Sequence, residues 1–146
     1  MISVTFPQHT AEEAYQLLGD NIISPIRAPH LFTDLVERFN MYYSGQKVAF
    51  PDKLDLSWAT PFQRKVWLAT RLIPYGETRS YGWVAKQIKQ NGAARATGQA
   101  LGKNPLPIII PCHRVIASNG NIGGFSSGIE MKKYLLSLET LTNTTQ

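Results

Sequence analysis

The sequence of 146 residues contains one cysteine, Cys112, and no apolar run near the length of a membrane-spanning helix. A single cysteine excludes an internal disulfide and a zinc site built from several cysteines. A bilayer span needs roughly 20 consecutive apolar residues. Residues 1–7 also lack the basic start and long apolar core of a secretion signal. We therefore expect an intracellular protein, cytoplasmic or, in a eukaryote, nuclear, with no membrane partner and no metal.

Acidic residues are scarce in the second part of the chain. Residues 61–146 contain 11 Lys or Arg but only 3 Asp or Glu, whereas residues 1–60 contain 4 Lys or Arg and 7 Asp or Glu. Hydrophobic residues make up 43% of the chain, which is enough for a packed core. The uneven charge favours a polyanionic partner for the second part, with nucleic acid first, although a basic solvated surface would have the same composition.

The first 59 residues are expected to form a shortened, mainly helical N-terminal region. Thr10 and Glu13 have the spacing of a capping box, and the helix that they start should stop at Gly19. A second helix is predicted over residues 29–44, where apolar side chains recur at helical spacing: Leu31, Leu35, Phe39 and Tyr42. One short strand fits residues 48–50. We interpret both helices as structural.

Residues 60–146 are expected to form a second, mostly helical domain. Thr60 followed by Pro61 is typical of a helix start, and an apolar stripe follows it: Phe62, Val66, Ala69 and Ile73. Residues 108–110 should be a short buried strand or extended segment, and residues 118–121 a turn. A final helix is predicted from Ile129 to Leu138. Together with the N-terminal region this predicts an α+β fold.

Two short helices joined by a turn lie in the middle of this domain. Ser80 should cap a helix over residues 81–88, residues 90–92 form a turn, and a second helix runs over residues 93–103. This order is the outline of a helix-turn-helix, whose second helix enters a DNA groove. Here that helix has small residues and one early arginine, Arg95, which favours close approach to DNA with an inserted side chain. Close packing against another helix would also explain the small residues.

Cys112 is followed directly by His113, a pair that can act in nucleophilic chemistry. A histidine can take the proton of a thiol, and a carboxylate can hold that histidine in the required tautomer. Side chains of neighbouring residues in extended backbone point to opposite faces, so we expect a water to bridge the two groups. Glu139 is the candidate carboxylate. A buried structural cysteine with a surface histidine and a solvated glutamate is the alternative.

The segment Pro111-Cys112-His113-Arg114-Val115 resembles the active-site signature of the O6-alkylguanine-DNA alkyltransferases. The resemblance runs from about Thr60 to Glu139 and includes Ile73-Pro74-Tyr75-Gly76-Glu77-Thr78, Ser80-Tyr81-Gly82, Arg95-Ala96-Thr97-Gly98, Asn104-Pro105 and Gly123-Gly124-Phe125-Ser126. It implies direct repair of DNA: one irreversible transfer of an alkyl group from the O6 atom of guanine, secondarily from O4 of thymine, to Cys112. It also implies that the base is flipped out of duplex DNA, that no cofactor is used, and that the protein acts as a monomer.

The resemblance also assigns roles to individual residues. Cys112 would be the alkyl acceptor, His113 the water-linked base, Glu139 the carboxylate behind it, and Asn104 the residue that orders the active-site turn. Tyr81 would rotate the target's phosphate and contact the flipped base, and Arg95 would fill its place in the stack. The other expected DNA-binding residues are Ala94, Ala96, Gly98, Gln99 and Lys103, and the substrate pocket would include Val115, Phe125, Ser126 and Tyr81.

Three features depart from the family pattern. Phe125 stands where tyrosine is common, so stacking is kept but a hydroxyl that could stabilise the leaving group is lost. The N-terminal region is short, and the single cysteine leaves no ligands for the structural zinc of some relatives. Two other classes stay open: a lesion-sensing DNA-binding module like the alkyltransferase-like proteins, and a helix-turn-helix transcription regulator. A Cys-His hydrolase is a more distant alternative, since the sequence has no evident oxyanion-hole motif.

Overall fold

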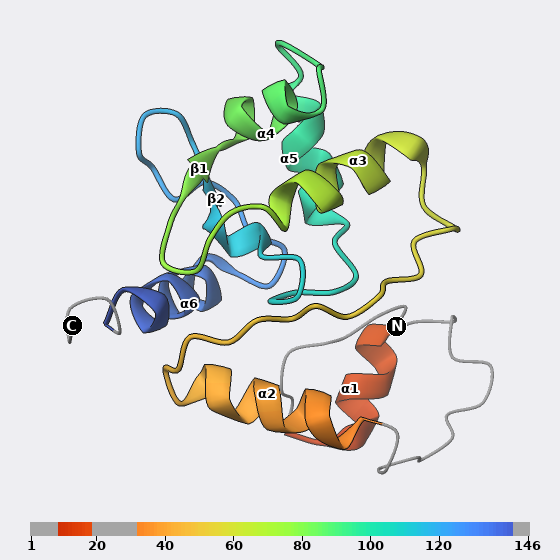
Figure 1. Ribbon diagram of the computed structural model, residues 1–146, viewed down its shortest axis with the longest axis vertical. Coiled ribbons are helices and arrows are strands. Elements are labelled where there is room, and N and C mark those ends of the chain that lie inside the picture. Colours follow the sequence, from red (N-terminus) through yellow and green to blue (C-terminus); the bar gives the residue numbers. More distant parts are fainter. Residues whose placement is uncertain (1–8, 19–31, 142–146) are drawn as a thin grey trace.

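The computed structural model describes residues 9–18 and 32–141 as an α+β fold (Figure 1). The elements follow in the order α1 (Ala11–Leu18), α2 (Thr33–Tyr43), α3 (Pro61–Thr70), β1 (Arg79–Ser80), α4 (Tyr81–Gln87), α5 (Ala94–Gly102), the 3₁₀ helix η3 (Cys112–Arg114), β2 (Val115–Ile116) and α6 (Ile129–Leu141). Gly19 and residues 29–31, which were predicted to end one helix and begin the next, lie outside the described residues. No helix in the described ranges is long and apolar enough to cross a membrane.

The helix starts follow the capping signals in the sequence. The hydroxyl of Thr60 accepts a hydrogen bond from the backbone N–H of Gln63, and the side chain of Gln63 accepts one from the N–H of Thr60, which completes a capping box. Ser80 caps α4 by accepting from the N–H of Trp83. Thr10 accepts from the N–H of Glu13 at 3.2 Å, as expected for α1. The predicted starts of these helices are therefore confirmed.

Two extended segments differ from the prediction. Residues 48–50 form no strand, and instead a parallel pair of two-residue strands joins β1 to β2, with Arg79 opposite Val115 and Ser80 opposite Ile116. Residues 108–110 are buried as expected, but they form a tight turn in which Ile108 has a φ of 72° and the N–H of Ile110 bonds the oxygen of Leu106. Strand pairing needs a partner at the right distance, which composition alone does not specify.

The main core lies between α3, α4 and α5. Trp67 on α3 is fully buried, and its indole N–H donates to the backbone oxygen of Ala100 on α5 at 2.9 Å. Val66, Val84 and Leu101 extend this apolar cluster across the three helices. The turn between α4 and α5 contains Gly92 with a φ of 84°, a left-handed conformation that glycine adopts without strain. The two helices therefore have the helix-turn-helix connection that the sequence predicts.

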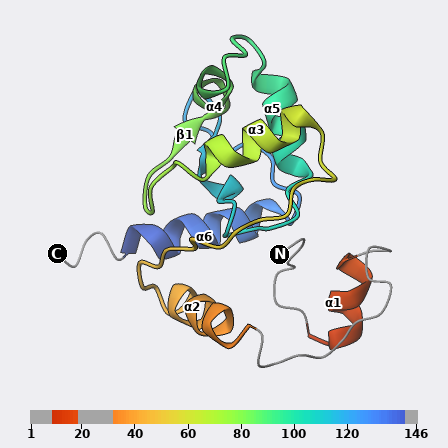
Figure 2. The ribbon, with the colours of Figure 1, turned by 45° about the vertical axis from the view of Figure 1, so that its right-hand side comes forward.

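A second apolar cluster joins α2 to α6. It consists of Tyr42, Tyr75, Ile108 and Leu135, all buried. Figure 2 shows α2 lying along the same side of the molecule as α6, with the connecting segment passing between α2 and α3. Arg38 on α2 forms an ion pair with Asp34 of the same helix and another with Asp52, which joins the middle of that connection to α2. The N-terminal helix α2 thus contacts the last helix of the chain directly.

Candidate active site

A pocket of about 650 Å³ opens between α4, α5 and the loop that follows β2, and it contains Cys112. Seven of the other predicted site residues also line it: Tyr81, Ala94, Arg95, Gly98, Gln99, Phe125 and Ser126. These residues come from three segments that are far apart in sequence. The fold therefore brings the predicted acceptor, the predicted DNA-reading helix and the predicted substrate wall to one cavity.

The remaining predicted residues lie behind or beside the pocket. His113 and Val115 are fully buried, and Glu139 is 1% exposed. Asn104 is half-buried in the turn after α5. Ala96 and Lys103 are exposed on α5 and at its C-terminal cap. None of these side chains is part of the pocket wall, so any effect on a bound base would act through other groups or through the DNA backbone.

Cys112 begins the short 3₁₀ helix η3, where extended backbone was expected. That expectation is wrong because Pro111 and the turn before it bend the chain, with the N–H of Cys112 bonded to the oxygen of Ile110 at 2.7 Å. The side-chain amide of Asn104 donates to Cys112 Sγ at 3.1 Å and to the oxygen of Ile110 at 2.8 Å. Burial raises the pKa of the Cys112 thiol, while the Asn104 bond and the charge of Lys132 act in the opposite direction.

Tyr81, the first residue of α4, forms one wall of the pocket. Its ring lies close to the glycines of two other segments. A Cβ added to Gly98 on α5 would be 3.6 Å from the ring, and one added to Gly123 would be 2.9 Å from the hydroxyl oxygen. Gly123 also has a φ of 75°. A side chain at position 123 would therefore displace the tyrosine, and glycine there keeps the ring in place.

Lys132 on α6 is a fully buried cation that the sequence analysis missed. Its ammonium donates to the backbone oxygen of Val115 at 2.6 Å and lies 5.8 Å and 5.9 Å from the ring centres of Tyr81 and Phe125. Burial lowers the pKa of Lys132 to about 8. The helical spacing of 132, 135 and 139 was the available signal, because it puts this lysine on the same face as two buried residues.

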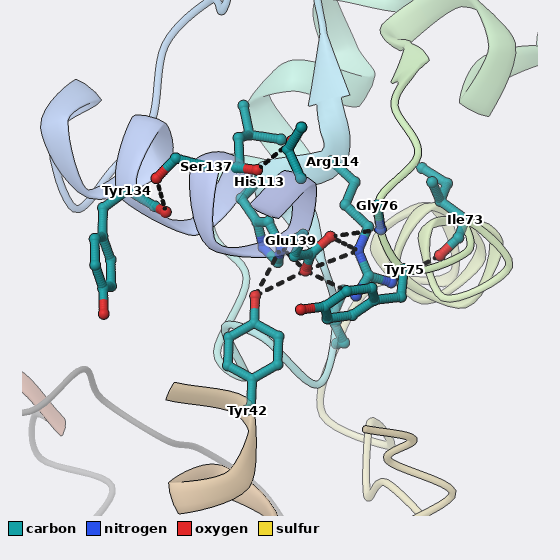
Figure 3. A network of polar contacts seen from close by, with 12 residues as sticks. Tyr42, Ile73, Tyr75, Gly76, His113, Arg114, Tyr134, Ser137 and Glu139 are labelled. Atoms are coloured by element: carbon teal, nitrogen blue, oxygen red, sulfur yellow. Dashed lines mark hydrogen bonds and ion pairs between the residues drawn. The ribbon is translucent and has the colours of Figure 1, made fainter. Parts of the chain in front are cut away.

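Glu139 is the centre of a buried polar cluster (Figure 3). Its carboxylate accepts from Arg114 Nε at 2.9 Å, from Arg114 Nη2 at 2.9 Å and from the backbone N–H of Gly76 at 2.9 Å. Oε1 lies 2.7 Å from Nε2 of His113. Although burial acts to raise the pKa of Glu139, these hydrogen bonds and charges prevail and lower it to about 2, so the carboxylate is ionised at neutral pH.

The ionised carboxylate determines the tautomer of His113. An ionised carboxylate is only an acceptor, so Nε2 of the imidazole must donate and therefore carries the proton. Burial lowers the pKa of His113, which keeps the ring neutral. Nδ1 is then an unprotonated nitrogen, and it has no partner among the described protein atoms. The arrangement leaves a lone pair on the ring of the residue next to Cys112.

Two further members of the cluster were not recognised in the sequence. Arg114 is buried and also donates to the backbone oxygen of Ile73 at 2.8 Å. Tyr42 on α2 donates from its hydroxyl to Glu139 Oε1 at 2.7 Å. Arg114 follows the Cys-His pair, so its position was a signal. Nothing in the local sequence around Tyr42 separates it from an ordinary core tyrosine.

The sequence matches a known family model, described as 6-O-methylguanine DNA methyltransferase, DNA binding domain, over residues 61–141. It is 49% identical over 111 residues to the methylated-DNA–protein-cysteine methyltransferase of Mycolicibacterium paratuberculosis, covering 76% of this chain and 67% of the relative. The corresponding protein of Methanosarcina acetivorans is 45% identical over 108 residues, covering 74% of this chain and 69% of the relative. The chain thus spans about two thirds of the length of these relatives.

Two solved structures are also similar. The first is Mycobacterium tuberculosis OGT in complex with DNA, with 50% identity, a TM-score of 0.72, and coverage of 75% of this chain and 68% of the other. The second is the O6-methylguanine-DNA methyltransferase of Pyrococcus kodakaraensis, with 33% identity, a TM-score of 0.65, and coverage of 88% and 75%. Both similarities extend beyond the residues that the family model matches.

Proposed function

The chain belongs to the 6-O-methylguanine DNA methyltransferase family, and we propose that it repairs duplex DNA by moving an alkyl group from O6 of guanine to the sulfur of Cys112. The observation that carries this proposal is the position of Cys112 in the wall of a cavity that Tyr81 and Arg95 also line. A cavity of about 650 Å³ is within the range of pockets that enclose small ligands. The nucleophile and the predicted DNA-contacting residues therefore meet where a flipped base would bind.

DNA approaches, in this proposal, along α5. The exposed Arg95 enters the base stack from the minor groove, while the small residues Ala94 and Gly98 let the helix come close to the DNA backbone. The target atom is not accessible inside a duplex, so the nucleotide must be extruded at a cost of a few kcal/mol. An alkylated guanine pairs poorly and is cheaper to extrude. Tyr81 and Phe125 then enclose the flipped base between aromatic walls.

The transfer is a single displacement at the alkyl carbon. His113 Nδ1 accepts the thiol proton of Cys112 through a bridging water, and the thiolate forms a new S–C bond as the C–O6 bond of the guanine breaks. The guanine leaves as an anion and takes up one proton, which restores the normal base. The product thioether contains no group that reverses the step, so each protein molecule reacts once. The alkyl donor is the damaged base itself, so the proposed reaction needs no cofactor.

Other groups stabilise the charges of this reaction. The amide of Asn104 and the ammonium of Lys132 both favour the thiolate form of Cys112. Phe125 supplies stacking without a hydroxyl, so the leaving guanine must be stabilised by other donors. O4-alkylthymine, a smaller base with a similar alkoxy carbon, is proposed as the secondary substrate.

We further propose that the two parts of the chain have different roles. Residues 60–146 would bind DNA and accept the alkyl group as one domain, and residues 1–59 would form a shortened N-terminal region. The protein would act as a monomer, since every proposed catalytic group comes from one chain. The charge distribution supports this division, because the net positive charge lies in the second part.

Intact mass measurement after reaction with a duplex carrying one O6-methylguanine tests the proposal. We expect the mass of one methyl group on the Cys112 peptide, saturating at one per protein, and no gain in a Cys112→Ala variant that still binds the lesion. Tight lesion binding without a mass gain in the wild type would favour the sensor class. If an undamaged duplex of one particular sequence competed for binding as well as the lesion duplex does, the result would favour a transcription regulator.

A further inference from the structure

Tyr42 reaches the catalytic cluster from outside the segment that matches the DNA-binding domain of the family. That match begins at residue 61, whereas Tyr42 lies on α2. Its side chain is fully buried, and its hydroxyl donates to Glu139 Oε1 at 2.7 Å. The same hydroxyl oxygen lies 3.3 Å from Nε2 of His113. Figure 3 shows the ring pointing from α2 toward the carboxylate and the imidazole.

The three groups form a closed triangle of hydrogen-bonding atoms. The one proton of the Tyr42 hydroxyl goes to Glu139, so its oxygen is left as an acceptor facing His113 Nε2. The Nε2 proton of His113 is then directed at two oxygens, Glu139 Oε1 and the Tyr42 hydroxyl. Neither oxygen offers a proton to Nε2. An imidazole in this triangle is therefore confined to the tautomer that has its lone pair on Nδ1.

We propose that Tyr42 is a positioning residue for alkyl transfer, which holds Glu139 and keeps the proton of His113 on Nε2 so that Nδ1 stays free to accept the Cys112 proton. This inference rests on the proposed function for its reaction, but the tautomer that it specifies can be measured without any reaction. In this proposal, α2 supplies a residue that orients the groups needed for alkyl transfer. Residues 61–141 alone would then contain the acceptor and its base but lack one of the groups that orient them.

The variant Tyr42→Phe removes the hydroxyl and keeps the ring. The ring contacts Tyr75 and Phe50 at centroid distances of 6.1 Å and 6.2 Å, and phenylalanine retains both contacts. Tyr43→Phe is the matched control. Tyr43 is the next residue of α2, its ring packs on that of Tyr42 at 5.8 Å, and its hydroxyl is outside the Glu139 cluster. The two variants therefore remove the same atom from neighbouring rings.

Three measurements on the full chain decide the question. Single-turnover transfer from the O6-methylguanine duplex should be about tenfold slower in Tyr42→Phe, the loss expected for one hydrogen bond to a charged group, with lesion affinity unchanged. The acid limb of the rate-against-pH profile should move, because the hydroxyl faces the base. Nitrogen NMR of labelled His113 should show one tautomer in the wild type. Tyr42→Phe should show a mixture, because Glu139 Oε1 loses the hydroxyl that helps to hold it against Nε2, and Tyr43→Phe should match the wild type.

The pH profile must be interpreted with the charged and titratable groups around the imidazole. These are Tyr42 from α2, Tyr75 from the segment before β1, Cys112 and Arg114 from η3, and Lys132 and Glu139 from α6. Tyr42→Phe changes none of the charges in this set at neutral pH, because burial raises the pKa of Tyr42 and the hydroxyl is protonated in the wild type. A shifted profile then reports the lost hydrogen bond.

The proposal is overturned if Tyr42→Phe keeps the wild-type rate, pH profile and His113 spectrum. It is also overturned if Tyr43→Phe slows transfer as much, since general packing of α2 would then be the cause. A wild-type protein that binds the lesion but transfers nothing contradicts the proposed function instead. In that case the His113 spectra of the two variants still decide whether Tyr42 sets the tautomer.

Discussion

The side-chain amide of Asn104 contacts the sulfur of Cys112, with 3.1 Å between Nδ2 and Sγ. Asn104 also bonds both ends of the turn that leads to Cys112: it donates to the oxygen of Ile110 and accepts from the N–H of Leu106 at 2.9 Å. One residue thus holds the shape of the turn and supplies a donor to the nucleophile. A change at position 104 therefore affects both the nucleophile and the turn, and the transfer rate and the stability of the variant must both be measured.

Asn104→Asp should slow alkyl transfer more than it destabilises the fold. The carboxylate can still accept from Leu106 but has no proton for Sγ or for the oxygen of Ile110, and its charge raises the pKa of the Cys112 thiol further. We expect a loss of roughly 10- to 100-fold in single-turnover rate at neutral pH, corresponding to about 1–3 kcal/mol. The reactivity of Cys112 toward a small alkylating reagent, followed against pH, should show its midpoint displaced upward. An unchanged midpoint would contradict the role given to the amide.

Arg95→Ala should impair reaction with duplex DNA and spare reaction with a free base. Arg95 is exposed at the start of α5, and its proposed task is to occupy the space left by the flipped nucleotide. Extruding the nucleotide costs a few kcal/mol, and Arg95 offsets part of this cost by filling the vacated space. Its removal should therefore slow transfer from duplex DNA by roughly tenfold or more. Transfer from the free alkylated nucleobase needs no extrusion and should stay at the wild-type rate. Lys133→Ala, which removes an exposed cation from α6, is the control.

Stability should fall in two steps as the protein is acidified. The pKa of His113 is lower in the folded protein than its ordinary value of 6.5. The contribution of the neutral imidazole to the free energy of unfolding is therefore lost as pH falls below 6.5. Glu139 has its pKa lowered from 4.5 to about 2, so its contribution is present above 4.5 and is lost as pH falls between these values. Urea unfolding at a series of pH values measures both steps.

Glu139→Gln should remove the lower of these two steps and destabilise the protein at pH 7. Arg114 would be left buried without its anionic partner, which typically costs about 3–5 kcal/mol. Glu130→Gln is the control, because Glu130 is an exposed carboxylate on the same helix. A Glu139→Gln protein with wild-type stability at pH 7 and an unchanged lower step would show that the buried cluster contributes little.

Lys132→Met should slow transfer at neutral pH and lose part of that defect in alkaline solution. The buried ammonium favours the thiolate of Cys112, and without it the thiol ionises only at higher pH. A loss of roughly tenfold is expected from about 1.4 kcal/mol. The wild-type pKa of Lys132 is lowered from 10.5 to about 8, so the unfolded chain binds more protons between these values and stability should rise with pH there. Lys132→Met should lack that rise, and its presence in the variant would rule out Lys132 as the source.

Local features were predictable from the sequence, because they depend on neighbouring residues. The capping box of Thr60 and Gln63, the Ser80 cap and the left-handed turn at Gly92 each follow from the chemistry of a few adjacent side chains. The residues that line the pocket were predictable for another reason. Tyr81, Arg95 and Cys112 lie in motifs whose order the family shares.

Contacts between distant parts of the chain were not predictable in this way. The bond from Tyr42 to Glu139 joins residues 97 apart, and no periodicity in either segment encodes it. The strands β1 and β2 have two residues each, too few for an alternating pattern. Extended backbone was expected at Cys112, but hydrogen bonds within the turn give the chain a 3₁₀ shape there.

The pairing of β1 with β2 has a consequence for how the length of this chain can vary. Arg79–Ser80 leads directly into Tyr81, and Val115–Ile116 follows Cys112 by three residues, so the register of two residue pairs sets the spacing of tyrosine and cysteine (Figure 1). One added residue in either short stretch would shift a side chain by about 3.3 Å, the rise of one residue along a strand. Insertions should be tolerated at the tip of the turn around Asn119 and excluded from residues 79–81 and 112–116, so natural or engineered length changes are expected to collect away from this pairing.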